Sequence, residues 1–166
     1  SGDVIPKPNV TRLDGDTVYF EDGTSAVFDA IIYATGYNIT FPFFDPEFIS
    51  APGNDIRLYK RMFSPGIDNL VFIGFAQAIP TLFPFIECQA KLMAAYAVGR
   101  YALPPVAEME RVIDADQKKY VGHCVDRPRH TQQVDYFHYE HDIRTREFPA
   151  GIKRAELHRR RVREAV

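Results

Sequence analysis

Residues 29–37 constrain the fold of this chain more than any other stretch, because they combine a buried-strand pattern with a terminal glycine. Residues 30–34 form a nearly continuous apolar run with β-branched and aromatic members. Such a run is typical of a strand buried on both faces, as in a parallel sheet covered by helices. Thr35 and Gly36 end the run, and a glycine at that point lets another backbone or a ligand come close. The pattern predicts a strand that leads to a binding crevice, although an ordinary buried strand and turn fits it equally well.

A second apolar run, residues 70–74, also ends in a glycine and predicts a second buried strand. A turn over residues 75–84 leads from it into an alanine-rich stretch over residues 85–99. That stretch predicts a helix stopped by Gly99 and the prolines that follow. We expect it to pack on the strand through the face formed by Ile86, Ala90, Met93 and Ala97. A strand that ends in glycine and is followed by a turn and a helix makes half of a nucleotide-binding unit.

The amino-terminal part shows a hairpin signal. Residues 9–13 and 17–20 alternate apolar and polar side chains around Asp14, Gly15 and Asp16. A second turn over residues 21–24 leads through residues 26–28 towards the first buried strand. The sequence therefore predicts a small antiparallel unit that feeds one buried strand.

The remaining segments differ in regularity. Residues 38–66 carry four prolines and five phenylalanines with little periodicity, which indicates a long irregular connection, functional or between two domains. Residues 106–120 predict an amphipathic helix, and residues 151–164 predict a final, strongly basic helix. Residues 127–148 are aromatic and charged, and we expect them to be less regular.

Composition restricts the class of protein. The chain of 166 residues is 46% hydrophobic and 13% aromatic, which indicates a folded protein. Its net charge of −2 gives no reason to expect nucleic acid or an anionic membrane as a partner. Two cysteines without a C-x-x-C pair favour a reducing compartment, so we expect a cytoplasmic protein.

Two further features concern the limits of the chain. The most apolar window, residues 70–86, is interrupted by glycine and proline, and predicts a buried strand and turn rather than a membrane span. Because the chain starts with Ser1 and has no initiator methionine, we expect it to begin within a larger protein, whose upstream part would be its partner.

Few residues suggest chemistry directly. G-x-G-x-x-G, Walker and G-x-S-x-G motifs are absent from the sequence. A metal site could be sought among the histidines and one cysteine, but their spacing lacks the paired ligands of a zinc site, which favours structural or surface roles for His123, Cys124, His130, His138 and His141. Glu87 and Asp135 are acid or base candidates without a paired nucleophile or carboxylate.

The last 17 residues are strongly basic. Six basic side chains against two glutamates give residues 150–166 a net charge of +4. This segment is either a docking surface for an acidic partner or nucleic acid, or a solvated basic helix end that the helix macrodipole favours. We favour the solvated helix.

Several spaced motifs occur together in one order. They are Val18-x-Phe-x-Asp-Gly23, Ala34-Thr-Gly-Tyr37, Phe41-Pro-Phe-Phe-Asp45, Leu58-Tyr-Lys60, Phe63-x-Pro65, Phe72-Ile-Gly74, Gln77, Glu87-x-Gln89, Leu103-Pro104 and Arg129-His-Thr-x-Gln-x-Asp-Tyr136. Each is common alone, but their order and spacing over residues 18–136 are specific. In this respect the chain resembles the carboxyl-terminal part of a flavin-containing monooxygenase.

The resemblance implies an α/β fold, namely part of a Rossmann-like flavoprotein with two dinucleotide-binding domains, a small β-hairpin unit and C-terminal helices. It implies FAD and NADPH as cofactors, and oxygen and a small-molecule substrate as reactants. Enzymes of this family form a C4a-hydroperoxyflavin and oxygenate a nitrogen or sulfur atom. The cofactor performs the chemistry, while the protein provides position and excludes water.

The resemblance also places cofactor-binding residues. It puts Thr35 and Gly36 where the NADPH domain returns to the FAD domain. The strand that ends at Gly74 would belong to the FAD domain. The turn after it, residues 75–82 with Phe75, Gln77 and Thr81, would lie against the flavin ring. A backbone N–H or an amide at the ring edge can stabilise negative charge on reduced flavin.

The departure from the family is large, because its glycine-rich nucleotide loops and signature histidine motif lie upstream in whole members and do not occur here. By this mapping residues 1–38 close an NADPH-binding domain and residues 39–166 form the end of an FAD-binding domain. We therefore expect an inactive fragment of a monooxygenase. The alternatives are a Baeyer–Villiger or N-hydroxylating relative, or a binding module without catalysis.

Overall fold

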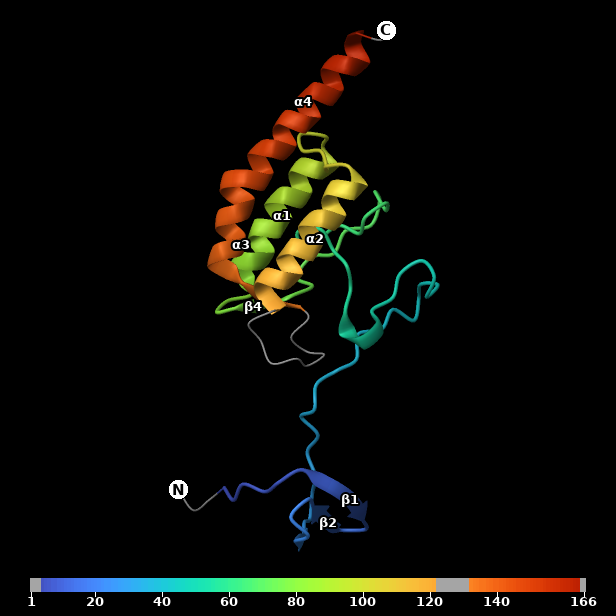
Figure 1. Cartoon of the computed structure of the whole chain (residues 1–166), viewed down its shortest axis with the longest axis vertical. Coiled ribbons are helices and arrows are strands. Elements are labelled where there is room, and N and C mark those ends of the chain that lie inside the picture. Colours follow the sequence, from blue (N-terminus) through green and yellow to red (C-terminus); the bar gives the residue numbers. More distant parts are fainter. Residues whose placement is uncertain (1–3, 122–131, 165–166) are drawn as a thin grey trace. The chain divides into compact units, whose positions relative to one another are not determined.

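The computed structural model describes residues 4–121 and 132–164, and the side chains of these except at positions 120 and 121. The chain divides into two compact units, Ser1–Tyr37 and Asn38–Val166. The first holds a three-stranded antiparallel sheet in the order β1-β2-β3, with β1 at Val10–Asp14, β2 at Thr17–Phe20 and β3 at Ser25–Val27 (Figure 1). The predicted hairpin and the second turn are confirmed.

The hairpin forms where its turn chemistry requires it. Asp14 pairs with Thr17, so the turn has two residues, and Gly15 has a φ of 61°. Two-residue turns of this kind match the twist of the flanking strands, and glycine adopts the left-handed conformation without steric cost. Val18 and Phe20 on β2 are buried in the unit.

The predicted buried strand over residues 30–34 is wrong for this chain. The structure describes residues 29–37 in full and assigns no strand to them, and Ile32 and Tyr37 are 90% and 96% exposed. A strand in the middle of a parallel sheet needs neighbours on both edges and layers on both faces. The described part of Ser1–Tyr37 provides only the antiparallel β1-β2-β3 sheet, and none of its strands pairs with these residues.

The second unit, Asn38–Val166, is mainly helical (Figure 1). Helix α1 spans Phe83–Ala97, α2 spans Val106–Val121, α3 spans Tyr136–Asp142 and α4 spans Phe148–Glu164. A π-helical turn at Ile143–Glu147 joins α3 to α4. Strand β4 (Gln77–Ile79) pairs in parallel with β5 (Gln133–Asp135). The predicted helices before Gly99, after Pro105 and at the carboxyl end are confirmed.

A shared apolar core joins these helices. It includes Phe85 and Leu92 from α1, Met109 and Ile113 from α2, and Tyr139 from α3. None of the helices in the described part of the chain combines the length and apolar character that crossing a membrane requires.

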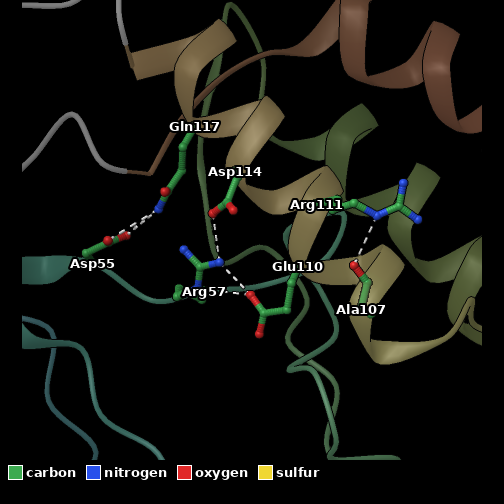
Figure 2. Close-up of polar contacts among 7 residues, drawn as sticks. All are labelled: Asp55, Arg57, Ala107, Glu110, Arg111, Asp114 and Gln117. Carbon is green, nitrogen blue, oxygen red and sulfur yellow. Dashed lines mark hydrogen bonds and ion pairs between the residues drawn. The ribbon is translucent and has the colours of Figure 1, made fainter.

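The long connection is irregular, as predicted, apart from a short 3₁₀ turn at Pro52–Asn54. Its buried residues Ile49, Ala51, Ile56 and Leu58 form a second apolar cluster. Phe41 packs against this cluster, and the centroid of its ring lies 5.7 Å from that of Phe72, which follows the connection. Charged groups fasten the connection to α2, as Figure 2 shows. Arg57 donates to Glu110 at 2.5 Å and to Asp114 at 2.8 Å.

Two further predictions fail in this unit. The structure assigns no strand to residues 70–74, where Val71 makes only an isolated bridge to Phe63 and Ile73 is 45% exposed. In addition, residues 136–148 are helical rather than irregular, while residues 127–131 lie outside the described part of the chain. The predicted irregularity rested on a mixture of charged and aromatic side chains. The helices bury members of both kinds, because Tyr139 and Glu147 are buried, whereas Phe137 and Arg144 are exposed.

The predicted packing face of α1 is wrong at two of its four positions. The residues of α1 that are buried are Phe85, Gln89, Leu92 and Ala95, whereas Ala90 and Ala97 are exposed. Ile86 and Met93 of the predicted face are partly buried and pack against the core, and the side chain of Ile86 lies against Gly74. The buried face contains a glutamine that makes hydrogen bonds inside the core, so a purely apolar pattern could not locate it.

Candidate cofactor-binding pocket

An open pocket of about 440 Å³ lies in the second unit, beside β4. We call it the Gly74 pocket, and its lining residues are Ile39, Gly74, Phe75, Ala76, Gln77, Ala78, Leu82 and Gln132. Most of its wall is therefore one continuous segment of backbone that leads into β4 and is rich in small residues.

Gly74 occupies the start of this wall in a left-handed conformation, with a φ of 73°. Its N–H donates to Oε1 of Gln89 across 2.7 Å. A Cβ at this position would lie 3.2 Å from the side chain of Ile86. Conformation and close packing therefore both favour glycine here.

Gln132 provides a second part of the wall. Its backbone carbonyl accepts the N–H of Gln77 at 2.8 Å, and its Nε2 donates to the carbonyl of Asn54 at 3.4 Å. Its Oε1 is buried and has no hydrogen-bond partner among the residues that the structure describes. Leaving a buried amide oxygen unpaired is costly, so this atom favours a donor from beyond the described residues.

The residues predicted to bind cofactor do not all come together. Gly74, Phe75 and Gln77 line the Gly74 pocket, whereas Thr81 is half-buried and not part of its lining. Thr35 and Gly36 belong to the other unit, Ser1–Tyr37. Gly36 has a φ of 88°, but a Cβ added there would meet no described atom within 4 Å.

Leu82 lies at the end of the turn that was expected against the flavin ring, whereas Ile39 and Gln132 were missed as pocket residues by sequence reasoning. Gln132 falls on an unspecified position of the last motif quoted above, and Ile39 lies in the connection, where no periodicity marks a function. They reach the pocket through tertiary contacts, which a local pattern does not contain.

The acid and base candidates have structural partners. Oδ1 of Asp135 accepts the N–H of His138 at 2.9 Å, which caps α3 and lowers the pKa of Asp135. Glu87 pairs with Lys91 one turn later on α1, and that hydrogen bond lowers the pKa of Glu87. Neither carboxylate lines the Gly74 pocket.

The histidines show no ligand cluster within the described ranges. His138 pairs with Asp135, and His141 lies near the end of α3, where its carbonyl accepts the hydroxyl of Thr145. Within residues 4–121 and 132–164, no group of three or more His, Cys, Asp or Glu side chains could hold a metal ion. His123, Cys124 and His130 lie outside these ranges.

A buried polar cluster at the start of α4 accounts for part of the basic segment. Glu147 accepts hydrogen bonds from Tyr101 and from Arg154, and Arg154 also donates to the carbonyl of Ala102 at 2.9 Å. Arg159 donates to the carbonyl of Gly99. These two arginines therefore hold α4 on the unit, while residues 160–164 are exposed.

A separate groove of about 290 Å³ lies between α1 and the α3 segment. Cys88 lines it, and burial raises the pKa of this thiol to about 11. Such a thiol is neutral at physiological pH, which makes it a poor nucleophile.

Comparison with known proteins identifies the family of this chain. Residues 1–149 match the family described as flavin-binding monooxygenase-like. The chain is 33% identical over 148 residues to flavin-containing monooxygenase 3 of Canis lupus familiaris, and 35% identical over 141 residues to the 4-hydroxybenzoate brominase (decarboxylating) of Pseudoalteromonas luteoviolacea. These matches cover 86% and 83% of this chain but only 27% of each relative, so the chain spans about a quarter of their length.

A solved structure is similar as well. The S-allyl-L-cysteine S-oxygenase from Allium sativum matches with a TM-score of 0.63 and 28% identity, over 84% of this chain and 36% of that one. The match of a family to nine-tenths of the sequence, together with relatives above 30% identity, settles the family. The chain belongs to the flavin-binding monooxygenase-like family.

Proposed function

We propose that the full-length protein is an FAD- and NADPH-dependent monooxygenase that oxygenates a soft nucleophile, an amine nitrogen or a sulfur atom. In this proposal residues 1–38 close its Rossmann-like NADPH-binding domain, and residues 39–166 form the end of its FAD-binding domain. The observation that carries it is the Gly74 pocket, where Gly74, Phe75 and Gln77 lie together in a chain of this family.

The residues of the Gly74 pocket suit a flat, partly polar ring. Ile39, Phe75 and Leu82 offer apolar surface, and Gly74 allows close approach of backbone. Gln132 Oε1 lacks a donor among the described residues, and a flavin ring carries an N–H on its polar edge. The chemistry of these groups therefore fits a flavin.

When bound, FAD supplies hydride acceptance and the transfer of an oxygen atom from O₂. The chain would hold the ring and shield it. The amide of Gln77 would donate to an electron-rich atom of the ring edge, and the apolar side chains of Ile39, Phe75 and Leu82 would keep water from the reacting face.

Thr35 and Gly36 complete the proposal. They would contribute at the junction of the two domains, where flavin and nicotinamide meet in the full-length protein. Gly36 is in the left-handed region, which favours glycine at that turn whatever lies beside it.

The test is a product analysis with the purified full-length protein. We expect a flavin absorption spectrum and, with NADPH and isotopically labelled oxygen, a sulfoxide or N-oxide that carries the label from a thioether or tertiary amine. Labelled ester from a ketone instead would favour a Baeyer–Villiger enzyme, and hydroxylamine from a primary amine would favour an N-hydroxylating relative. A protein that binds no flavin and oxidises no NADPH would contradict the proposal and favour a binding module.

A further inference from the structure

Gln89 is a polar residue at the centre of an apolar core. It is 1% exposed, lies on the buried face of α1 with Phe85 and Leu92, and contacts Tyr139 of α3. Burying an amide is costly unless its hydrogen-bonding groups are satisfied, and here they are. Oε1 accepts the N–H of Gly74 at 2.7 Å, while Nε2 donates to the carbonyl of Arg61 and to the hydroxyl of Tyr139, both at 3.3 Å.

These bonds connect three segments that are distant in sequence. The first is the turn at Lys60 and Arg61, whose φ angles of 51° and 56° are unusual for side chains of this size. The second is α3, because the hydroxyl of Tyr139 donates to the carbonyl of Lys60 at 2.8 Å. The third is Gly74, at the start of the pocket wall. Gln89 therefore joins the pocket to the core.

The bond to Gly74 fixes the direction of the pocket wall. A hydrogen bond at the Gly74 N–H sets the plane of the peptide that precedes the wall, and glycine itself restrains that plane little. Three residues later, the N–H of Gln77 is held by the carbonyl of Gln132 at 2.8 Å. The wall is thus tied at both ends, once to α1 and once to the segment that leads into β5.

We propose that Gln89 is a positioning residue for the Gly74 pocket, which sets the backbone of Gly74 and through it the groups that face a bound ligand. Gln89 does not line the pocket itself. That the ligand is FAD rests on the proposed function, but the role of Gln89 in shaping the wall does not.

Three variants of the full-length protein separate this role from general stability. Gln89→Met keeps a side chain of similar length and removes every hydrogen bond of the amide. Gln89→Glu retains an acceptor for Gly74. Tyr139→Phe removes the hydroxyl from the same network and leaves the bond between Gln89 and Gly74 in place, which makes it the matched control.

The first measurement is amide hydrogen exchange over residues 74–78. Gln89→Met should accelerate it about tenfold, as expected when one buried hydrogen bond that limits local opening is lost. Tyr139→Phe should leave it within about twofold of wild type, even though it lowers the unfolding midpoint, and Gln89→Glu should restore most of the protection. Unchanged exchange in Gln89→Met, or equal acceleration in Tyr139→Phe, would overturn the proposal.

The second measurement is the dissociation constant and visible spectrum of added FAD. If the proposed function holds, Gln89→Met weakens FAD binding about tenfold and shifts the flavin spectrum, whereas Tyr139→Phe changes neither. If the wild-type protein binds no FAD, the proposed function fails while the exchange result still decides the role of Gln89. FAD bound equally well by wild type and Gln89→Met, with exchange over residues 74–78 unaltered, would contradict the inference outright.

Discussion

The backbone N–H of Ile39 donates a hydrogen bond to Oδ1 of Asn54 across 2.7 Å. Asn54 also accepts, through its carbonyl, the side-chain N–H of Gln132. Its φ of 62° lies in the left-handed region, which asparagine tolerates better than most residues. Because Ile39 and Gln132 both line the Gly74 pocket, one residue of the irregular connection joins two parts of the pocket wall.

Replacing Asn54 by glycine should measure what the hydrogen bond between Ile39 and Asn54 Oδ1 contributes to the free energy of unfolding. Asn54→Gly keeps the left-handed backbone and removes Oδ1, so we expect the free energy of unfolding to fall by about 1 kcal/mol, the usual worth of one hydrogen bond. Asn54→Asp retains the oxygen, so its free energy of unfolding should be closer to that of wild type. Urea denaturation of both variants checks this, and Asn54→Gly as stable as wild type would show that the bond contributes nothing.

Gly151 on α4 packs directly against the ring of Tyr101. A Cβ on Gly151 would lie 2.1 Å from two ring carbons, and Glu147 holds that ring through its hydroxyl. Helix propensity alone predicts that Gly151→Ala stabilises the protein by up to about 1 kcal/mol. We expect the opposite sign, a loss of roughly 1–3 kcal/mol, because the ring must move in a packed core.

The exposed helix position Lys153 provides the control for this change. Lys153→Ala should alter the free energy of unfolding by no more than about 0.5 kcal/mol, since its side chain lies on the surface of the same helix. Chemical denaturation of the two variants side by side gives the comparison, and a stabilised Gly151→Ala would rule out the packing explanation.

The elements that sequence predicted are those whose cause is local. The hairpin follows from a two-residue turn with Gly15, and α1 ends where Gly99 and the later prolines require it. The two predicted strands failed because a parallel strand depends on neighbours that are distant in sequence. Residues 30–34 have the composition of such a strand and find no strand partner within the described part of the chain.

The residues of the candidate site also differ in whether a local pattern could indicate them. A glycine after an apolar run indicated Gly74, and the adjacent Phe75 and Gln77 followed from the resemblance to a known family. Gln132 and Asn54 act through contacts between segments far apart in sequence, so neither periodicity nor spacing could indicate them. Gln89 belongs to one of the quoted motifs, but its bond to Gly74 is a tertiary contact that the motif does not contain. A buried glutamine also breaks the apolar pattern from which the packing face of α1 was predicted.

The thiol of Cys88 should react slowly at neutral pH. Burial raises its pKa above the ordinary value of 9.0 to about 11, so the thiolate becomes abundant only near that pH. The rate of alkylation by iodoacetamide, followed by mass spectrometry of the peptide that contains Cys88, should rise with a midpoint near 11. A midpoint at or below 9.0 would contradict the burial of this group.

The same shift has a consequence for stability. As pH rises, the thiol of Cys88 ionises near 9.0 in the unfolded chain and only near about 11 in the folded chain. Between these two pH values the unfolded state therefore binds fewer protons than the folded state. We therefore expect the free energy of unfolding to fall as pH rises from about 9 to 11, and Cys88→Ala should lessen that fall.

The isolated 166-residue chain should purify colourless. The sequence contains no glycine-rich loop that opens a helix, and such helix amino termini are what hold the pyrophosphate of FAD. Absorbance of the purified chain after incubation with FAD and gel filtration checks this. A yellow protein with stoichiometric flavin would show that the Gly74 pocket and its surroundings hold the cofactor without those loops.

The most direct test of the account is the hydrogen peroxide released per NADPH consumed by the full-length protein. Gln77 lines the Gly74 pocket, so Gln77→Ala should leave the fold intact and release more peroxide, because a looser flavin site admits water. His138 and His141 lie outside the pocket, so His138→Ala and His141→Ala should release the same amount of peroxide per NADPH as wild type. If the histidine variants lose activity while Gln77→Ala remains fully coupled, the pocket assigned here is not the flavin site.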